Sequence, residues 1–250
     1  HKLKFTPAKA AQRLASRTTG NIGFVLRDDH FTRSEPFYTQ VLLGTEYEAN
    51  HHELYVLLTT IPYQFDRQLH TPRFLKENNV DGLLVAGKVD RGFFETVDSS
   101  EIPTVLIDFE FEGCPAVLID NEEGGRQATD HLVDRGHQAI GFLGADTKHP
   151  SIRGRMDGYK LALSATGLPV QDRLIITSEN GEPDMEMGRD LFKALSSLDP
   201  MPTAVFCAND ALALTVLNLA RNESVNVPDD LAVVGFDDVD GASRATPGLT

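Results

Sequence analysis

Asn and Asp residues stand at the ends of two apolar runs in the second half of the sequence. Asn209-Asp210 follows the run at 203–207, and Asp237-Asp238 follows the run at 231–236. Continuous apolar runs of this length are typical of parallel strands that are covered on both faces. Open α/β sheets bind ligands at the carboxyl ends of such strands. These residues therefore mark the edge of the sheet at which a ligand is expected to bind.

A second chemical feature is the basic N-terminal segment, which contains no Asp or Glu. Its cations are Lys2, Lys4, Lys9, Arg13 and Arg17. Of the 23 Lys and Arg residues, 18 lie beyond Arg17 together with all 37 Asp and Glu, so that part carries a formal charge of −19. A short basic segment joined to an acidic globular part indicates a polyanion as one partner. The acidic part itself argues against broad nucleic-acid binding.

The basic segment also has the pattern of a short helix. Thr6 is a candidate N-cap and Pro7 suits a first helical turn, which predicts a helix over residues 7–16. Ala10, Ala11, Leu14 and Ala15 form its narrow apolar face. A helix this short needs a partner or DNA to be stable, and a Leu can wedge between base steps in the minor groove. The alternatives from composition alone are a frayed leader and a surface helix.

Catalytic and metal-binding patterns find little support. The sequence has no G-x-S-x-G, no P-loop and no G-x-G-x-x-G after a strand. Cys114 and Cys207 lack CxxC or metal spacing, which indicates reduced core thiols in a cytosolic protein. His51-His52, His131 and His137 also lack metal spacing. We expect neither an enzyme nor a metal or cofactor site.

The bulk composition bounds the class of protein. The 250 residues are 41% hydrophobic with a formal net charge of −14, which is ordinary for a globular chain long enough for one large domain or two lobes. No run approaches the ~20 apolar residues of a membrane span. The N-terminus also lacks the apolar region of a secretory signal.

Strand and helix patterns alternate from residue 21 onward. Strands are expected at 22–27, 54–59, 82–86, 104–108, 116–119, 139–143, 173–177, 203–207 and 231–236, and helices at 36–50, 65–78, 91–98, 122–135, 152–166, 184–197 and 210–222. This alternation predicts an α/β fold with parallel sheets flanked by helices. The rhythm restarts after a C-cap glycine at Gly136. We therefore expect a linker over 1–17 and two lobes over 18–136 and 137–250.

Six segments, in order, resemble the LacI family of bacterial transcription regulators, and the resemblance covers essentially the whole chain. They are FTPAKAAQRLASRTTGNIGFV, DNEEGGRQATDHLVDRGHQAIGFLG, SIRGRMDGYKLAL, FCANDALAL, VVGFDD and the terminal TPGLT. The resemblance implies a two-lobed, periplasmic-binding-protein-like (type I) fold that binds an effector between its lobes. It also implies that residues 1–17 correspond to the family's hinge. Against the family pattern, the chain starts after the DNA-binding headpiece and stops at Thr250, before the segment that returns to the first lobe.

The resemblance also implies site residues. Arg155, in R-x-x-G-Y, corresponds to the family's effector-clamping Arg, and Gly158 in the same motif allows close helix packing. Asn209 is expected to face the cleft while Asp210 caps the following helix, and Asp237 is expected to accept ligand hydroxyls. Ser151, one turn before Arg155, is a weaker candidate. The alternatives are a surface ion pair for Arg155 and a helix cap for Asn209.

In the first lobe, the candidates are Asp28 and Asp108 for ligand hydroxyls and Phe37 for stacking on a sugar face. For DNA, the candidates are Leu14, Ala11, Lys9 and Arg13 in the hinge. The resemblance thus predicts a cytoplasmic repressor that acts as a homodimer, binds operator DNA and responds to a small, sugar-like effector. A periplasmic sugar-binding protein and a sugar-metabolising enzyme are the alternatives.

Overall fold

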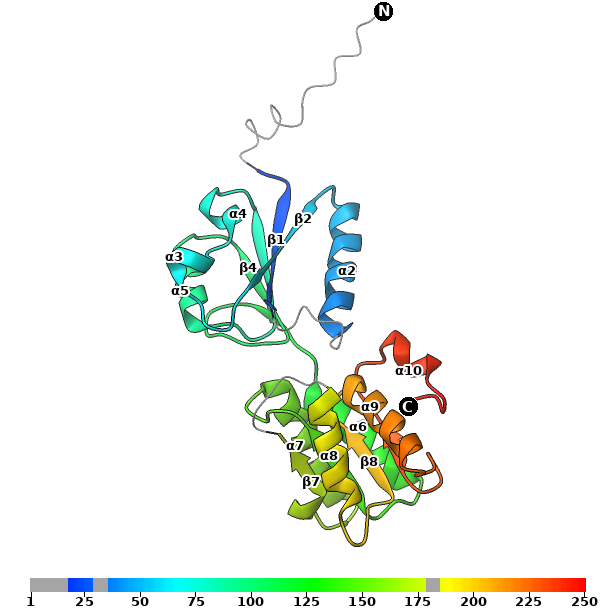
Figure 1. The fold of residues 1–250 in the computed structure, drawn as a ribbon. Helices are drawn as coiled ribbons and strands as arrows, with labels where there is room; N and C mark the ends of the chain where they lie inside the picture. Colours follow the sequence, from blue (N-terminus) through cyan, green and yellow to red (C-terminus); the bar gives the residue numbers. More distant parts are fainter. Residues whose placement is uncertain (1–17, 29–35, 179–184) are drawn as a thin grey trace, which may run out of the picture. The chain divides into compact units, whose positions relative to one another are not determined.

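The computed structural model describes residues 18–28, 36–178 and 185–250. The chain forms two compact units, with the division between Leu118 and Ile119 (Figure 1). The expected boundary at Gly136 is therefore displaced by one helix. Gly136 does end that helix, with φ +92°, but the helix belongs to the second unit because it packs against that unit's core.

The first unit is built on a five-stranded parallel sheet in the order β2-β1-β3-β4-β5. Its strands are β1 (Asn21–Arg27), β2 (Tyr55–Ile61), β3 (Gly82–Ala86), β4 (Thr104–Ile107) and β5 (Ala116–Val117). The interior strand β1 places Phe24 opposite Leu58 of β2 and Leu84 of β3. This arrangement brings the carboxyl ends of β1 to β4 to one edge of the sheet.

Helices cover both faces of this sheet. Helix α2 (Pro36–His51) covers the face that carries Phe24, Leu26 and Ala86. The opposite face packs against α4 (Arg73–Lys76) and α5 (Arg91–Asp98), with Phe93 fully buried between them and the sheet. Because alternate residues of a strand point to opposite faces, the continuous apolar runs supply both cores.

The expected helix at 65–78 is instead two short helices, α3 (Arg67–His70) and α4. Pro72 separates them, because a proline has no backbone N–H and restricts the residue before it to extended conformations. Asp66 begins α3 by accepting hydrogen bonds from the amides of Gln68 and Leu69.

The second unit has a four-stranded parallel sheet in the order β7-β6-β8-β9. Its strands are β6 (Ile140–Gly144), β7 (Ile175–Thr177), β8 (Ala204–Cys207) and β9 (Ala232–Val234), and its helical elements are α6 (Asn121–Asp134), α7 (Pro150–Ala165), η2 (Asp172–Leu174), α8 (Met185–Ser196), α9 (Asp210–Asn222) and α10 (Asp240–Arg244). Helices α6 and α7 pack on one face around Phe142 and Phe206, and α8 and α9 pack on the other around Val205 and Cys207 (Figure 1).

Helices α6 and α7 approach each other closely because glycines line their contact. A Cβ at Gly158 would overlap the carbonyl oxygen of Glu122, and one at Gly125 would overlap the backbone of Arg155. This confirms the close helix packing predicted at Gly158. The contact sets the position of the Arg155 backbone relative to the start of α6.

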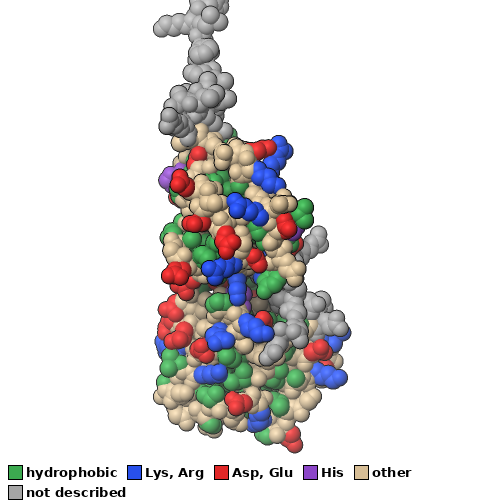
Figure 2. All heavy atoms as spheres, turned by 90° about the vertical axis from the view of Figure 1, so that its left-hand side faces the viewer, with side chains coloured by type: hydrophobic (Ala, Val, Ile, Leu, Met, Phe, Trp, Pro, Cys, Tyr) green, Lys and Arg blue, Asp and Glu red, His purple; other side chains and the backbone are tan. Residues whose placement is uncertain are grey.

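The surface carries charges of both signs. On the face that Figure 2 shows, acidic and basic side chains lie interspersed among polar and apolar ones. Among the described residues, no helix is long and apolar enough to cross a lipid bilayer.

Candidate functional site

Arg155 is the centre of a cluster of side chains in the second unit. It lies in the second turn of α7 and is only 5% exposed. Its Nε donates to Asn121 Oδ1 at 2.9 Å, and its Nη1 donates to the carbonyl oxygen of Ala208 at 2.6 Å. Its Nη2 lies 3.3 Å from Asp237 Oδ1. The alternative of a surface ion pair for Arg155 is therefore wrong, because its guanidinium is buried and contacts three partners.

The partners of Arg155 come from three separate elements. Asn121 begins α6, Ala208 follows β8, and Asp237 follows β9. The guanidinium carbon also lies 3.7 Å from the centroid of the Phe236 ring, and a Cβ at Gly124 would come within 2.5 Å of the same ring. A cation with so many fixed partners is preorganised, because its donors need little reordering when a ligand arrives.

The backbone after β9 is unusual at this cluster. Asp237 has φ 109° and Asp238 has φ 52°, a region that L residues other than Asn and Asp seldom occupy. Such a conformation costs on the order of 1–3 kcal/mol and is found preferentially at ligand sites. Asp237 adopts this positive-φ conformation while its carboxylate contacts Arg155.

The structure corrects the capping residue expected at the start of α9. Asn209 is the N-cap, because its Oδ1 accepts a hydrogen bond from the amide of Leu212 at 2.9 Å. Asp210, expected to be the cap, is buried and accepts from the amide of Val239 at 2.9 Å. Both residue types fill N-caps well, so composition alone could not decide between them.

Asp210 is electrostatically unusual. Burial raises the pKa of its carboxyl, and the amide of Val239 and the Arg155 charge offset this only in part. Its own amide donates to the carbonyl oxygen of Phe236 at 2.9 Å. Asp210 therefore joins the start of α9 to the loop after β9, which contains Asp237.

Ser151 is buried in the first turn of α7. It precedes Arg155 by four residues, so both lie on the same helix face. Its amide donates to Nδ1 of His149, the N-cap of this helix.

The first-unit candidates lie toward the carboxyl edge of their sheet, where Asp108 and Phe37 both contact Tyr38. Asp108, after β4, is buried and accepts a hydrogen bond from the hydroxyl of Tyr38 at 3.0 Å. Phe37 lies beside the core cluster and meets the Tyr38 ring edge-on, with centroids 5.0 Å apart. Asp28, after β1, is exposed.

The hinge candidates Leu14, Ala11, Lys9 and Arg13 lie outside the described residues. Within residues 18–28, 36–178 and 185–250, no group of three His, Cys, Asp or Glu side chains is arranged to hold a metal ion.

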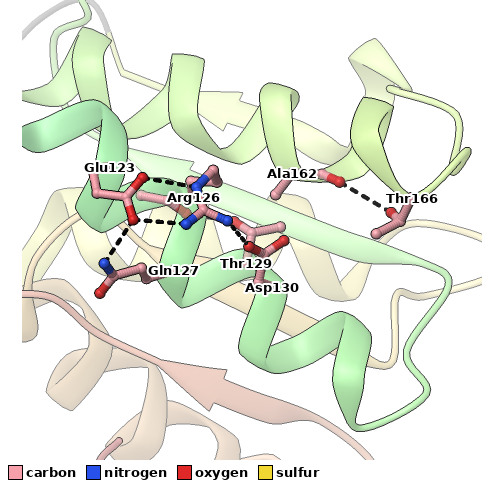
Figure 3. Close-up of polar contacts among 8 residues, drawn as sticks. Glu123, Arg126, Gln127, Thr129, Asp130, Ala162 and Thr166 are labelled. Atoms are coloured by element: carbon pink, nitrogen blue, oxygen red, sulfur yellow. Dashed lines mark hydrogen bonds and ion pairs between the residues drawn. The ribbon is translucent and has the colours of Figure 1, made fainter.

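A second arginine, Arg126 on α6, pairs with carboxylates of its own helix. It donates to both carboxylate oxygens of Glu123 and also pairs with Asp130 (Figure 3). Hydrogen bonds from Arg126 and Gln127 lower the pKa of Glu123 to about 2. Because its donors are committed to neighbouring turns of one helix, we do not include Arg126 in the candidate site.

Two contributors to the site were not predicted from the sequence. Asn121 lies in D-N-E-E, a pattern that indicates a helix start rather than a ligand-binding residue. Phe236 was placed at the end of a strand, although β9 ends at Val234. The sequence signal that could have pointed to Phe236 is its position directly before the candidate residue Asp237.

Comparison with known proteins agrees with this architecture. Residues 129–250 match the periplasmic binding protein-like domain. Catabolite control protein A of Priestia megaterium is 30% identical over 253 residues, which cover 100% of this chain and 74% of that protein. The HTH-type transcriptional repressor PurR of Photobacterium profundum is 30% identical over 252 residues, covering 99% and 73%.

Solved structures show the same relationship. The transcriptional regulator CelR in complex with cellobiose superposes with a TM-score of 0.79 at 26% identity, over 99% of this chain and 79% of the other. A LacI-family regulatory protein from Chloroflexus aggregans gives a TM-score of 0.73 at 26% identity, over 92% and 83%. The chain belongs to the LacI family of transcription regulators.

Membership of the LacI family confirms the predicted fold and class of function. The relatives are transcription regulators rather than enzymes or proteins of periplasmic uptake. In this LacI-family chain, the buried Arg155 cluster belongs to the unit that contains the periplasmic binding protein-like match.

Proposed function

We propose that this LacI-family chain binds a neutral, sugar-like effector through Arg155 and thereby controls the binding of operator DNA. The observation that carries the proposal is the buried guanidinium of Arg155, held by Asn121, Ala208 and Asp237 and facing the Phe236 ring. A preorganised guanidinium suits adjacent hydroxyls, since it presents several N–H donors in a fixed plane.

The charge balance of the cluster supports a neutral ligand. The positive charge of Arg155 is compensated by Asp237 at 3.3 Å, so an anionic effector would have to compete with a carboxylate that is already in place. Among the similar proteins, CelR was solved in complex with cellobiose, and the ribose operon repressor of Haemophilus influenzae is 28% identical over 250 residues. Both relatives point to sugars.

Other proposed effector contacts are Ser151, Asn209 and Asp237 in the second unit and Asp28, Asp108 and Phe37 in the first. The Asp carboxylates would accept hydrogen bonds from sugar hydroxyls, whereas the Ser151 hydroxyl and the Asn209 amide can donate or accept. The Phe37 ring would stack on a sugar face. Asn209 Oδ1 already caps α9, and Asp108 Oδ2 already accepts a hydrogen bond from Tyr38. Each residue would therefore contact the effector through the other polar atom of its side chain or through a second hydrogen bond to the same oxygen.

The proposed mechanism is a population shift. An effector that binds one conformation better than another favours that conformation, and DNA affinity changes reciprocally. We propose that the chain acts in the cytoplasm as a homodimer. In this proposal Leu14 and Ala11 enter the minor groove while Lys9 and Arg13 contact phosphates.

A thermal-shift and calorimetry experiment tests the effector site. The wild-type chain is screened against cellobiose, ribose and other neutral sugars, with sugar phosphates as the anionic comparison. A sugar at 100 times its Kd should stabilise the chain by about 2.7 kcal/mol and raise its Tm by roughly 5–10 °C. Titration calorimetry then measures the Kd of the sugar found.

The matched variants are Arg155→Ala and Arg153→Ala. Arg153 lies on the same helix but is more accessible than the buried Arg155. Arg155→Ala should weaken sugar binding by roughly 30-fold or more, because hydrogen bonds to a charged group contribute about 1.5–3 kcal/mol each, whereas Arg153→Ala should bind like the wild type. Equal Kd values for a folded Arg155→Ala protein and the wild type would refute the site, and a preference for sugar phosphates would refute the neutral effector.

A further inference from the structure

The chain enters the first unit through a hydrogen-bonded corner at residues 19–21. Thr19 and Gly20 directly precede β1, and Gly20 has φ +70°, a conformation that glycine adopts without strain. The carbonyl oxygen of Gly20 accepts from the amide of Tyr55, the first residue of β2, at 2.9 Å. The corner is therefore tied to the neighbouring strand before β1 begins.

Asp81 makes the shortest hydrogen bonds with this corner. Its Oδ1 accepts from the amide of Thr19 at 2.7 Å, and its Oδ2 accepts from the amide of Gly20 at 2.6 Å. Its own amide donates to the carbonyl oxygen of Asn21 at 2.8 Å. We name this arrangement, Asp81 with residues 19–21, the Asp81 anchor.

Two further observations show that the anchor is a defined structure. The Asn21 side chain is buried, and its Nδ2 donates to the carbonyl oxygen and to Oδ1 of Asn79, both at 3.0 Å. Partial burial raises the pKa of Asp81, but the donors of Thr19, Gly20 and Asn21 outweigh it and hold the pKa below its usual value. The anchor therefore favours the ionised carboxylate.

The position of the anchor links it to the basic segment. Arg17, the last cation of that segment, is two residues before Thr19. Asp81 directly precedes β3, which pairs with β1 in the interior of the sheet. One residue, Thr18, thus separates the basic segment from a point that is bonded to the central strands.

We propose that Asp81 is a positioning residue for DNA binding, because it fixes the point at which the basic segment leaves the sheet of the first unit. This inference rests on the proposed control of DNA through residues 1–17. Because the anchor fixes this attachment point, a movement of the first unit should also move the start of the basic segment at Arg17. If the anchor opens, the segment loses its defined starting point and binding must bear the entropy of ordering it.

The anchor itself is tested by limited trypsin digestion followed by mass spectrometry. Trypsin needs an extended chain on both sides of the bond it cuts, so cutting after Arg17 requires residues 18–20 to leave Asp81. Cutting after Arg13 does not involve the anchor and serves as the internal reference. Asp81→Ala and the milder Asp81→Asn should raise the ratio of cutting at Arg17 to cutting at Arg13 by roughly tenfold, since charged hydrogen bonds are lost.

The matched control is Asp66→Ala. Asp66 also accepts hydrogen bonds from two backbone amides, those of Gln68 and Leu69, but it begins α3 rather than holding the residues before β1. It should leave the Arg17 to Arg13 ratio unchanged. In NMR spectra, the amide protons of Thr19 and Gly20 should also shift with the titration of Asp81. An unchanged ratio in both Asp81 variants would overturn the anchor.

The DNA role is tested in a chimera in which the helix-turn-helix part of PurR from Photobacterium profundum precedes residue 1. Fluorescence anisotropy measures its affinity for DNA that PurR binds. Asp81→Asn should weaken binding by roughly tenfold while Asp66→Ala leaves it unchanged. Equal affinity of the wild-type and Asp81→Asn chimeras would refute the positioning role. A wild-type chimera that fails to bind would refute the proposed DNA control instead, while the trypsin ratio still decides the anchor.

Discussion

At the residue scale, Asp210 is a carboxyl whose environment disfavours its charge. Its raised pKa means that the unfolded chain loses this proton at a lower pH than the folded chain. As the pH rises from the unfolded value through the folded one, the contribution of Asp210 to stability therefore decreases, and the loss is complete above the folded pKa.

This behaviour makes a prediction for Asp210→Asn. The amide keeps an acceptor for the Val239 N–H but carries no charge, so the variant should become more stable relative to the wild type as the pH rises above the unfolded pKa. Urea unfolding at several pH values measures the difference. Asp98→Asn, an exposed change on α5, controls for the loss of one negative charge. A difference that stays constant with pH would contradict the raised pKa.

The sequence predicted the central residues of the site better than their roles. Arg155 and Asp237 were both expected and lie together. That Asn209 rather than Asp210 caps α9 could not be foreseen, because adjacent Asn and Asp have similar capping preferences. The contact of Asn121 with Arg155 spans 34 residues and depends on how closely two helices pack, which no local pattern specifies.

At the element scale, two helical glycines have opposite surroundings. Gly44 in α2 has no atom within 4 Å of a Cβ placed on it, whereas a Cβ at Gly158 in α7 would overlap the backbone of α6. Helix propensity favours Ala at both positions by about 1 kcal/mol. Only the packing differs between them.

The same substitution should therefore change stability in opposite directions. Gly44→Ala should raise the free energy of unfolding by about 0.5–1 kcal/mol, and Gly158→Ala should lower it by about 3 kcal/mol as α6 and α7 are forced apart. Chemical denaturation followed by circular dichroism measures both. A neutral Gly158→Ala variant would show that the two helices tolerate a wider separation.

Long elements were predicted well because they carry strong periodic signals. The expected helices at 91–98 and 210–222 agree with α5 and α9. Shorter elements were predicted less well. The Thr71-Pro72 break and the five-residue α10 depend on local turns, and the strand expected at 231–236 is only β9, 232–234. Strand ends follow from pairing with neighbours, which the sequence of one strand does not specify.

At the scale of the whole molecule, the two units have separate cores. The first is built around Phe93 and Phe24 and the second around Phe206 and Val205. The expected boundary at Gly136 was wrong because Leu132 of α6 packs with the core of the second unit. A helix between two sheets can cover either one, and its amphipathic pattern does not say which.

Separate cores predict separate unfolding. Phe93→Ala and Phe206→Ala each remove a ring that is 0% exposed and should each cost about 3–5 kcal/mol. Hydrogen exchange with mass spectrometry should show faster exchange in β1, β3 and β4 for Phe93→Ala, and in β6, β8 and β9 for Phe206→Ala. The other unit should keep the exchange rates of the wild type, because separate hydrophobic cores can open independently. Equal acceleration in both units by either variant would mean that the 250 residues unfold as one cooperative body, and the division at Leu118 would then be geometric without being energetic.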